Sequence, residues 1–489
     1  MDRTKIFKLI MPKKLSKKQN IYCIGVKGVG MTMLAQFLAA KGNKISGSDI
    51  VDVFLTDRVL RKAKIKVFSP FAVKNIPDKI DAIIYSTSQD LKNNPELAFI
   101  KNNPARFQGV SFLSYAEALG QVFNQYRGVA VCGSHGKTTT SAWLGYVLMK
   151  AGKKPNVLVG SRVPQFAGSG LSGSSSDFIA EVDEYQNKLQ YFQPHGVVLN
   201  NIDYDHPDFF KTPAAYTKVF ADFVKKIPAR GFLVVSQRDL ESQKIKRYCR
   251  GKLISYNLVT GSYGAGADYL AYDVKTSGIF QSFSLSYQGE ALGRFKIKLW
   301  GEHNILNALA TIAAAREMKV AWPQIRKHLA GFRGTDRRAQ ILGKYKGALI
   351  VDDYAHHPTE IKSTLAGLRR HYPTKNIITV FHPHTFTRTK AFFKDFAVSF
   401  ADTNELIVLD IYGSAREKQG DVSSRELVVA IKKYNQSARI KQPVRAIANI
   451  PEAIQYLKNR LQARDSLVLM GAGDVFRIAD GLLKPNQRK

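Results

Sequence analysis

The sequence predicts an α/β protein in which two Rossmann-like domains flank a central domain with a phosphate-binding loop (P-loop). Its 489 residues correspond to roughly three domains at about 150 residues each. In the first and last thirds of the chain, β-branched runs alternate with helical segments, which is typical of parallel sheets covered by helices. Between them, a strand leads directly into the glycine-rich turn G-S-H-G-K-T at 133–138.

The first domain, residues 1–118, and the third domain, residues 331–489, are both expected to contain parallel sheets. Predicted elements of the first domain are Ile21–Ile24, a helix that ends near Ala40, Ile45–Ser48 and Asp81–Ser86. Predicted strands of the third domain are Ala348–Val351, Ile377–Phe381, Leu406–Leu409 and Ser466–Met470, and its predicted helices are Thr359–Arg370 and Thr387–Phe400.

The central domain, residues 119–330, is expected to combine a parallel sheet with a smaller antiparallel sheet. Its predicted elements are Arg127–Cys132, a helix from the glycine-rich turn to Lys150, Phe178–Val182, Val197–Asn200 and a helix over Asn304–Met318. Between 268 and 299 apolar and polar residues alternate, as in F-S-L-S-Y at 283–287, which predicts antiparallel strands.

The composition is that of a globular protein. Apolar residues make up 45% and charged residues 23%, which excludes a disordered or fibrous chain. The longest stretch without Asp, Glu, Lys or Arg, residues 253–267, is too short for a transmembrane helix, and the basic N-terminus has no apolar signal-peptide core. Cys23, Cys132 and Cys249 have neither disulfide nor zinc spacing. We therefore expect a cytoplasmic protein without membrane insertion.

The net charge of +34, from 73 Lys plus Arg against 39 Asp plus Glu, invites a nucleic-acid interpretation. The basic residues are, however, spread along the whole chain, with no zinc finger, RRM signature or repeated aromatic platform. A lysine-rich bias or anionic small substrates such as nucleotides also account for the charge. A nucleic-acid-associated NTPase therefore remains only a remote alternative.

The turn at 133–138 predicts an ATP site. Between a strand and a helix, its backbone N–H groups and the helix N-terminus can cradle phosphate oxygens. Lys137 would then reach the β- and γ-phosphates, and the Thr138 hydroxyl would bind Mg²⁺. The general pattern has another glycine where this chain has Val131, so a chance glycine turn is the competing interpretation.

Acidic and imidazole side chains follow the next two predicted strands. They are Glu181, Asp183 and Glu184 after the first strand, and Asp203, Asp205 and His206 after the second. Because the carboxyl ends of neighbouring parallel strands converge on a ligand-binding crevice, Glu181 and His206 are expected to serve the ATP site. The alternative is that they are solvated loop residues, as most acidic residues are.

A second glycine turn, G-V-K-G-V-G at 25–30, precedes the first predicted helix. Lys27 breaks the G-x-G-x-x-G pattern, and Asp49 follows where a ribose-binding acid of a nicotinamide enzyme is expected. Taken alone, this turn indicates either a dehydrogenase or a site for another diphosphate at the helix N-terminus, to which Lys27 could add a cation.

Seven of the ten histidines lie in compact polar clusters: His135, His206, His303, His356, His357, His382 and His384. Most of them belong to motifs that occur in one order along the chain. These motifs are G-S-H-G-K-T-T-T (133–140), E-V-D-E-Y (181–185), N-N-I-D-Y-D-H (200–206), G-E-H-N-I-L-N-A (301–308), G-T-D-R-R (334–338), D-D-Y-A-H-H-P-T-E (352–360), H-P-H-T-F-T-R-T (382–389) and G-A-G-D (471–474). Together they resemble the Mur ligases of peptidoglycan synthesis, and the resemblance extends from Ile21 to about Asp480.

The resemblance implies an ATP-dependent amide ligase, most similar to the Mur ligases that add L-alanine to UDP-N-acetylmuramate. In this reaction ATP phosphorylates the lactyl carboxylate, and the amine attacks the acyl phosphate through a tetrahedral intermediate. The resemblance also implies two Mg²⁺ ions and a domain closure that keeps water from the acyl phosphate. We expect a monomer or homodimer.

The family's motifs assign roles to individual residues. The implied catalytic residues are Lys137, Glu181, His206 and Arg338, of which Lys137 would stabilise the transferring phosphate. Thr138 and Glu181 would hold one Mg²⁺, and His206 the second. The implied ATP site is Gly133, Ser134, His135, Gly136, Lys137, Thr138, Thr139, Asn304, Asn307, Arg338 and Asp353, with the two asparagines toward adenine, Arg338 at the phosphates and Asp353 at the ribose.

Two further sites are implied by the resemblance. The UDP diphosphate would bind at Gly25, Lys27, Gly28 and Gly30, with Asp49 near the uridine ribose, and this would explain the broken dehydrogenase fingerprint. The amino-acid pocket would contain Tyr354, His356, His384 and Arg388. Arg388 would pair with the alanine carboxylate, because a guanidinium fork suits a carboxylate.

Three departures from the family pattern bear on substrate choice. Lys27 replaces a glycine that is common in the first turn, which affects how UDP would bind. Thr385 stands where some members have arginine, so amino-acid recognition would depend more on Arg388. E-V-D-E-Y-Q-N-K (181–188) resembles the related ligase that recycles a murein tripeptide, and this activity is the alternative. The segment P-H-T-F-T-R-T (383–389) favours L-alanine.

Overall fold

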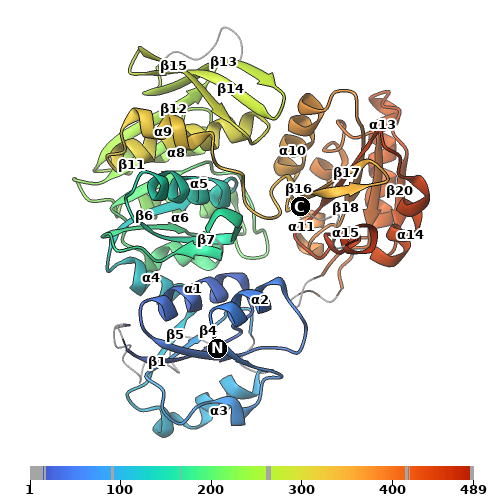
Figure 1. Cartoon of the computed structure of the whole chain (residues 1–489). Helices are drawn as coiled ribbons and strands as arrows, with labels where there is room; N and C mark the ends of the chain where they lie inside the picture. Colours follow the sequence, from blue (N-terminus) through green and yellow to red (C-terminus); the bar gives the residue numbers. More distant parts are fainter. Residues whose placement is uncertain are drawn as a thin grey trace.

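The computed structural model describes Leu15 and residues 18–89, 93–166, 168–259, 266–413, 417 and 419–484. The N-terminal segment that was considered for a signal peptide, and part of the uncharged stretch 253–267, lie outside these residues. Three sheets follow one another along the chain. In Figure 1 the first lies at the bottom, the second above it and the third at the side of the second.

The first sheet is parallel, with the strand order β3-β2-β1-β4-β5. Its strands are β1 (Asn20–Ile24), β2 (Lys44–Ser48), β3 (Lys66–Phe68), β4 (Ala82–Tyr85) and β5 (Ser111–Ser114). The α-helices of this part are α1 (Val29–Ala40), α2 (Leu55–Lys62), α3 (Pro95–Asn102) and α4 (Tyr115–Phe123). This is the Rossmann-like arrangement that the alternating strands and helices predict.

The second sheet has ten strands in the order β15-β14-β13-β12-β11-β10-β6-β9-β7-β8. They are β6 (Arg127–Cys132), β7 (Asn156–Val163), β8 (Gly168–Leu171), β9 (Asp177–Glu181), β10 (Gly196–Leu199), β11 (Phe232–Ser236), β12 (Lys252–Leu258), β13 (Tyr269–Ser277), β14 (Phe280–Tyr287) and β15 (Glu290–Ile297). The helices are α5 (Lys137–Lys150), α6 (Pro213–Val224), α7 (Leu240–Ile245), α8 (Glu302–Glu317) and α9 (Trp322–Leu329). The predicted antiparallel strands are present, but β13 pairs in parallel with β12, so they extend the parallel sheet and form no separate sheet.

The third sheet has the order β16-β17-β21-β18-β19-β20, and only β16 is antiparallel to its neighbour. Its strands are β16 (Gln340–Tyr345), β17 (Ala348–Asp353), β18 (Asn376–Phe381), β19 (Glu405–Leu409), β20 (Val444–Ile447) and β21 (Asp465–Met470). The helices are α10 (Pro358–His371), α11 (Phe386–Ala391), α12 (Phe393–Ala397), α13 (Ser424–Ser437), α14 (Ile450–Arg460) and α15 (Arg477–Leu482).

The predicted fold class is confirmed, and most predicted strands and helices agree with the structure within two residues. The single helix predicted over Thr387–Phe400 is wrong. The chain forms the two short helices α11 and α12, which are separated at Phe392 with φ −107° and ψ 23°. The Phe392 ring packs against the His357 ring, with centroids 4.7 Å apart, and this contact favours the break. The domain boundaries remain predictions; the boundary at 118 falls within α4.

One apolar cluster joins the first two sheets. The ring of Phe178, on β9, contacts Phe37 of α1 and Phe123 of α4, with centroids 5.2 and 5.8 Å apart. All three side chains are buried in the same core cluster. The first domain is therefore fixed to the central domain by a shared aromatic core.

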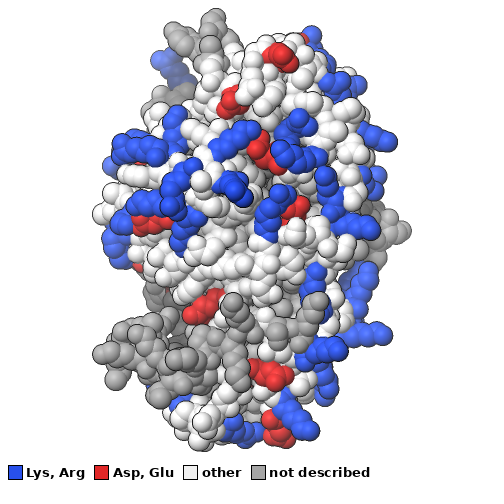
Figure 2. All heavy atoms as spheres, turned by 90° about the vertical axis from the view of Figure 1, so that its left-hand side faces the viewer, with Lys and Arg blue, Asp and Glu red and all other residues white. Residues whose placement is uncertain are grey.

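The positive charge is dispersed on the face shown in Figure 2. Lys and Arg side chains are scattered over that face, with single Asp or Glu side chains between them and no continuous basic stripe. None of the helices in the described part of the chain is both long and apolar enough to cross a lipid bilayer.

Replacement of Phe178 by alanine tests the shared core. Phe178→Ala should lower the free energy of unfolding by about 3–5 kcal/mol, because it removes a buried aromatic ring and leaves a cavity. The measurement is urea unfolding followed by circular dichroism. The control, Leu240→Ala, truncates a side chain that is 75% exposed and should change stability by less than about 0.5 kcal/mol. Equal effects of the two variants would contradict the proposed contact.

Candidate active site

The glycine-rich turn connects β6 to α5 as predicted. Gly136 precedes the first residue of α5 and has φ +80°, a left-handed conformation that favours glycine. A Cβ at this position would also collide with the side chains of Asn307 and Asn200. The N–H of His135 donates to Asn201 Oδ1 at 2.9 Å, and Gly133 lies against the Asn201 backbone. The turn is thus held by the asparagines that follow β10.

Lys137 is the first residue of α5, and its ammonium lies inside the turn. It donates to the carbonyl oxygens of Gly133 and Ser134 and lies 3.4 Å from Glu184 Oε2. Burial alone would lower the pKa of Lys137, but the carboxylates, with Glu184 the strongest, raise it above its usual value. Lys137 therefore carries a positive charge where phosphate oxygens would lie.

Two carboxylates at the end of β9 complete this cluster: Glu181 is the last residue of the strand, and Glu184 follows it. Glu181 accepts a hydrogen bond from the Thr138 hydroxyl at 2.8 Å, so the pair predicted for the first metal ion is brought together. Glu184 is almost fully buried and accepts from the Tyr216 hydroxyl at 2.8 Å. It also lies 3.7 Å from His206 Nε2, so His206 faces the same cluster.

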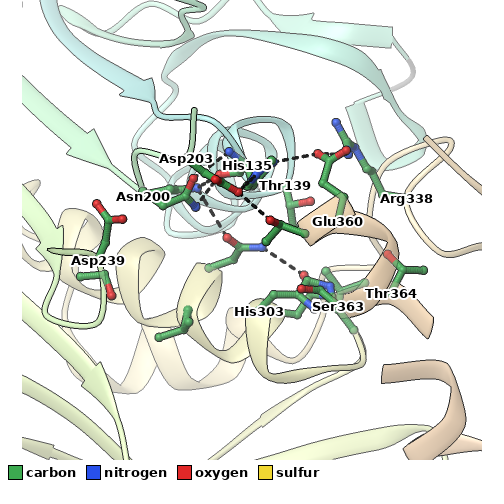
Figure 3. A pocket seen from close by; sticks show the side chains of 18 of the residues that line it. His135, Thr139, Asn200, Asp203, Asp239, His303, Arg338, Glu360, Ser363 and Thr364 are labelled. Atoms are coloured by element: carbon green, nitrogen blue, oxygen red, sulfur yellow. Dashed lines mark hydrogen bonds and ion pairs between the residues drawn. The ribbon is translucent and has the colours of Figure 1, made fainter. Parts of the chain in front are cut away.

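A cavity of about 400 Å³ adjoins the glycine-rich turn at His135 and Gly136 and lies between the second and third sheets (Figure 3). Its walls come from the turn, the loop after β10, α8 and α10. Predicted ATP-site residues that line it are His135, Gly136, Thr139, Asn304, Asn307, Arg338 and Asp353. The other predicted members of the site, Gly133, Ser134, Lys137 and Thr138, belong to the turn and the start of α5.

The polar groups of the cavity are linked to one another. Asn307 donates to Asn304 Oδ1 at 3.2 Å, and both side chains are nearly buried. Arg338 lies 3.6 Å from Glu360 and above the ring of Tyr354. Asp353 accepts backbone hydrogen bonds from Ala339 and Ala355, and burial raises its pKa. These contacts hold the side chains in place around a space of nucleotide size.

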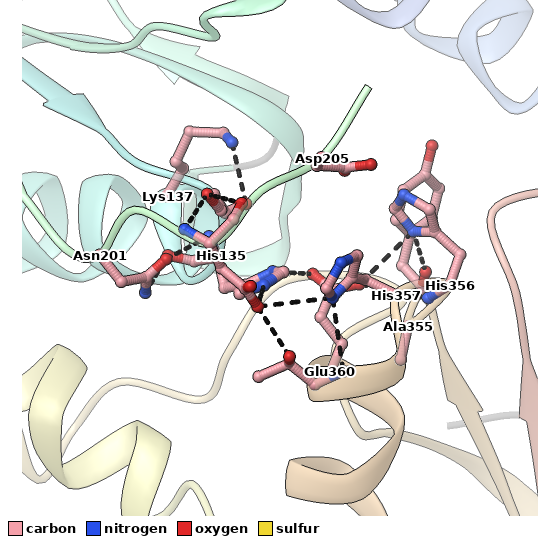
Figure 4. Close-up of polar contacts among 12 residues, drawn as sticks. His135, Lys137, Asn201, Asp205, Ala355, His356, His357 and Glu360 are labelled. Atoms are coloured by element: carbon pink, nitrogen blue, oxygen red, sulfur yellow. Dashed lines mark hydrogen bonds and ion pairs between the residues drawn. The ribbon is translucent and has the colours of Figure 1, made fainter. Parts of the chain in front are cut away.

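His135 connects the central and third sheets. Its Nε2 lies 2.9 Å from Asp203, and its Nδ1 lies 3.2 Å from Glu360 on α10 (Figure 4). Burial alone would lower the pKa of His135, but the hydrogen bonds to Asp203 and Glu360 raise it to about 9. Thr359 donates to the same Asp203 oxygen at 2.7 Å. His135 is therefore a charged imidazolium between two carboxylates.

Asp203, His135 and His357 could also hold a metal ion, since their ligand atoms lie within 4.8 Å of one another. However, both ring nitrogens of His135 already lie within hydrogen-bonding distance of a carboxylate. The proton on His135 supplies the positive charge that a metal ion would bring, so we interpret this group as an ion-pair cluster.

The predicted amino-acid residues lie together on the third sheet's side of the crevice. The His356 ring centroid is 5.3 Å from that of Tyr354 and 6.0 Å from that of His384. Arg388 Nη1 lies 3.3 Å from His384 Nδ1. Burial, followed by the charge of Arg388, lowers the pKa of His356 to about 3 and that of His384 to about 4. Both imidazoles are therefore neutral.

The fork of Arg388 is engaged by Asp205. Its Nε and Nη2 donate to Asp205 Oδ1 at 3.0 and 2.9 Å, and Nη2 also lies 3.2 Å from Oδ2. The sequence predicted that this fork would bind the carboxylate of the amino-acid substrate, and it did not predict the contact with Asp205. Of the three guanidinium nitrogens, only Nη1 makes no contact with Asp205.

In the glycine turn at 25–30, the residues predicted to bind UDP make contacts with the protein itself. The Lys27 ammonium donates to the carbonyl oxygens of Ile50 and Asp52, and Asp49 accepts from the Lys27 N–H at 2.6 Å. Gly28 caps α1, and a Cβ on Gly30 would lie 2.8 Å from the Tyr115 ring. Gly25 has φ +80° and lies against Ser86. The turn is well ordered by these contacts, but the Lys27 ammonium is already hydrogen-bonded inside it.

Two residues belong to the site although the sequence assigned neither a role. Glu360 ends the motif D-D-Y-A-H-H-P-T-E. Its position in the first turn of a predicted helix could have marked it as a residue of the site. Tyr216 lies on α6 and contacts Ser134 and Glu184, and no local motif marks it.

Three family models match the chain in order. They are "Mur ligase family, catalytic domain" over residues 20–127, "Mur ligase middle domain" over 131–315 and "Mur ligase, glutamate ligase domain" over 337–473. The UDP-N-acetylmuramate–L-alanine ligase of Desulfitobacterium hafniense (strain Y51) is 36% identical over 466 residues, which are 95% of this chain and 99% of that protein. The chain belongs to the Mur ligase family.

Solved structures have the same three-domain Mur ligase fold. UDP-N-acetylmuramate-alanine ligase MurC from Thermotoga maritima has a TM-score of 0.78 at 22% identity, covering 94% of this chain and 97% of that one. A murein peptide ligase from Psychrobacter arcticus has a TM-score of 0.71 at 21% identity, covering 95% and 98%. At these identities the two structures show the fold of this Mur ligase and do not separate the two activities.

The charge of His135 predicts a pH-dependent stability of this Mur ligase. Its folded pKa of about 9 exceeds the ordinary 6.5, so its stabilising effect is complete below pH 6.5 and is lost as the pH rises through 9. The difference in Tm between the wild type and His135→Gln should therefore shrink from pH 6.5 to 9.5 in differential scanning calorimetry. A difference that stays constant over this range would contradict a charged His135.

Proposed function

We propose that this Mur ligase uses ATP to join L-alanine to the lactyl carboxylate of UDP-N-acetylmuramate in the synthesis of peptidoglycan precursors. Curated relatives with this activity in their names are similar along almost the whole chain. The structural observation that carries the proposal is the loop after β10. Its Asp203 contacts the phosphate-binding turn, and its Asp205 contacts Arg388 in the amino-acid pocket, so the two half-sites adjoin.

The first step transfers the γ-phosphoryl group of ATP. A lactyl carboxylate oxygen attacks the γ-phosphorus, the bond to the β,γ-bridging oxygen breaks, and ADP leaves. Lys137 and Arg338 stabilise the charge that develops on the phosphoryl oxygens. Asn304 and Asn307 face the adenine side of the cavity and Asp353 the ribose, while the UDP diphosphate binds at the N-terminus of α1, at the turn of Gly25, Gly28 and Gly30.

The oxygen-rich cluster beside the turn fits Mg²⁺. Thr138 and Glu181 offer hard oxygen donors side by side, and His206 faces the neighbouring Glu184. When bound, Mg²⁺ would neutralise phosphate charge and orient the phosphoryl oxygens. We assign Thr138 and Glu181 to one ion and His206 to a second.

The second step forms the amide bond. The L-alanine ammonium loses a proton to water, the free amine attacks the carbonyl carbon of the acyl phosphate, and the nitrogen gives up a second proton to water as the amide forms. The tetrahedral intermediate then expels inorganic phosphate. Low pKa values for His356 and His384 keep them unprotonated at neutral pH, so that they are able to accept hydrogen bonds from the ammonium. A cytoplasmic location fits substrates of this kind.

Replacement of Lys137 tests the phosphoryl-transfer role. Lys137→Ala should lower turnover by about two to three orders of magnitude, because the charge it supplies acts on the transition state. It should also lower the Tm, because the buried Glu184 carboxylate loses its cation. Lys150→Ala, at the exposed end of the same helix, is the matched control and should keep wild-type turnover. Near-normal turnover of folded Lys137→Ala would refute the assignment.

The amino-acid substrate is tested by phosphate release with UDP-N-acetylmuramate and one amine at a time, with mass spectrometry of the product. L-alanine should give the fastest release and a product of the mass of UDP-N-acetylmuramoyl-L-alanine. Faster ligation of the tripeptide L-Ala-γ-D-Glu-meso-diaminopimelate would instead establish the murein tripeptide recycling activity. Phosphate release that depends on nucleic acid would revive the remote alternative.

A further inference from the structure

The contact between Asp205 and Arg388 is a buried ion pair across two sheets. Asp205 follows β10, and Arg388 lies on α11; their side chains are 10% and 7% exposed. Three donor–acceptor distances of 3.2 Å or less join them. The carboxylate and the guanidinium are therefore paired within the protein.

The geometry of the pair decides which part of Arg388 remains for a substrate. Asp205 takes Nε and Nη2, which form one edge of the guanidinium group. Nη1 points toward His384 Nδ1 at 3.3 Å, on the side of His356. A carboxylate that enters between these residues therefore meets the Nη1 end of the guanidinium group and not the Nε–Nη2 edge that Asp205 occupies.

Asp205 also fixes the backbone of its own loop. Its Oδ1 accepts from the His206 N–H at 2.7 Å, and His206 has the left-handed φ of +58°. One carboxylate thus holds both Arg388 and the residue that faces Glu184. A shift of Asp205 would move both groups.

We propose that Asp205 is a positioning residue for the amino-acid substrate. It accepts hydrogen bonds from one edge of Arg388 and thereby orients Nη1 toward the substrate carboxylate. The proposal rests on the proposed function, because it deepens the account of the same pocket. It assigns amino-acid recognition to the Nη1 end of a guanidinium group whose other edge is held by Asp205, a residue of the central domain. Asp205 itself does not touch the substrate in this account.

Asp205→Asn tests the proposal, because it keeps the size of the side chain and removes its charge. The KM for L-alanine should rise about tenfold or more, while the KM for ATP stays within about twofold. Formation of the acyl phosphate, trapped with hydroxylamine in the absence of L-alanine, should continue at the wild-type rate, because the Asn Oδ1 can still accept from the His206 N–H. Asp205→Glu keeps the charge and should recover part of the alanine KM. Asp222→Asn, an acid on the outer face of α6, is the control and should leave both KM values unchanged.

A double-mutant cycle with Arg388→Lys gives an independent readout. If Asp205 acts through Arg388, the double variant should have an alanine KM no higher than that of Arg388→Lys alone. An unchanged alanine KM in Asp205→Asn, a parallel rise of the ATP KM, or additive effects in the cycle would overturn the proposal. If the wild type forms no L-alanine product, the proposed function itself fails, and that result is distinct from a failure of Asp205 to position Arg388.

Discussion

Buried carboxylates that need cations are the constraint on which the crevice depends. Glu184 meets Lys137, and Asp205 meets Arg388. Glu360 meets His135, which also pairs with the partly exposed Asp203. An unpaired carboxylate at this depth would cost several kcal/mol, so each cation must stay in place. Arg388 and Glu360 lie on α11 and α10, beside the third sheet, and their partners lie on loops that follow strands of the second sheet. This pairing therefore also fixes how the two sheets face each other.

The same pairing creates a chemical difference among the histidines. His135 lies between two carboxylates and has a pKa of about 9, whereas burial, followed by the charge of Arg388, lowers the pKa values of His356 and His384 to about 3 and 4. A charged imidazolium therefore adjoins the glycine-rich turn, and neutral imidazoles line the proposed amino-acid pocket. Phosphoryl oxygens need positive charge, and a substrate ammonium needs hydrogen-bond acceptors, so each kind of histidine suits the chemistry proposed beside it.

Local sequence patterns predicted the strands, the helices and the clusters of polar residues, but not the ion pairs that join distant parts of the chain. Runs of buried β-branched residues marked β6 and β10, and glycines that need left-handed φ marked the phosphate-binding turn. Asp205 and Arg388 are 183 residues apart, and no spacing rule relates them. The break at Phe392 depends on a ring contact with His357, which helical periodicity does not contain. Tertiary contacts of this kind decide where the fork of Arg388 points, and for that reason its occupation by Asp205 was missed.

Residues 181–188, which depart from the family pattern, lie beside the phosphate-binding turn and not beside Arg388. The Tyr185 ring lies 4.7 Å from the His206 ring, and Lys188 pairs with Asp183 at 2.8 Å. Gln186 and Asn187 both have left-handed φ, so the segment makes a tight turn next to His206. The unusual residues thus pack on the side of the cluster that faces Lys137 and Glu184, whereas Arg388 and His384 approach from the third sheet. A change that acts on His206 alters how the phosphoryl end of the site is held. The segment is therefore weak evidence for a tripeptide substrate, and in the proposed function the choice of amine depends on the surroundings of Arg388.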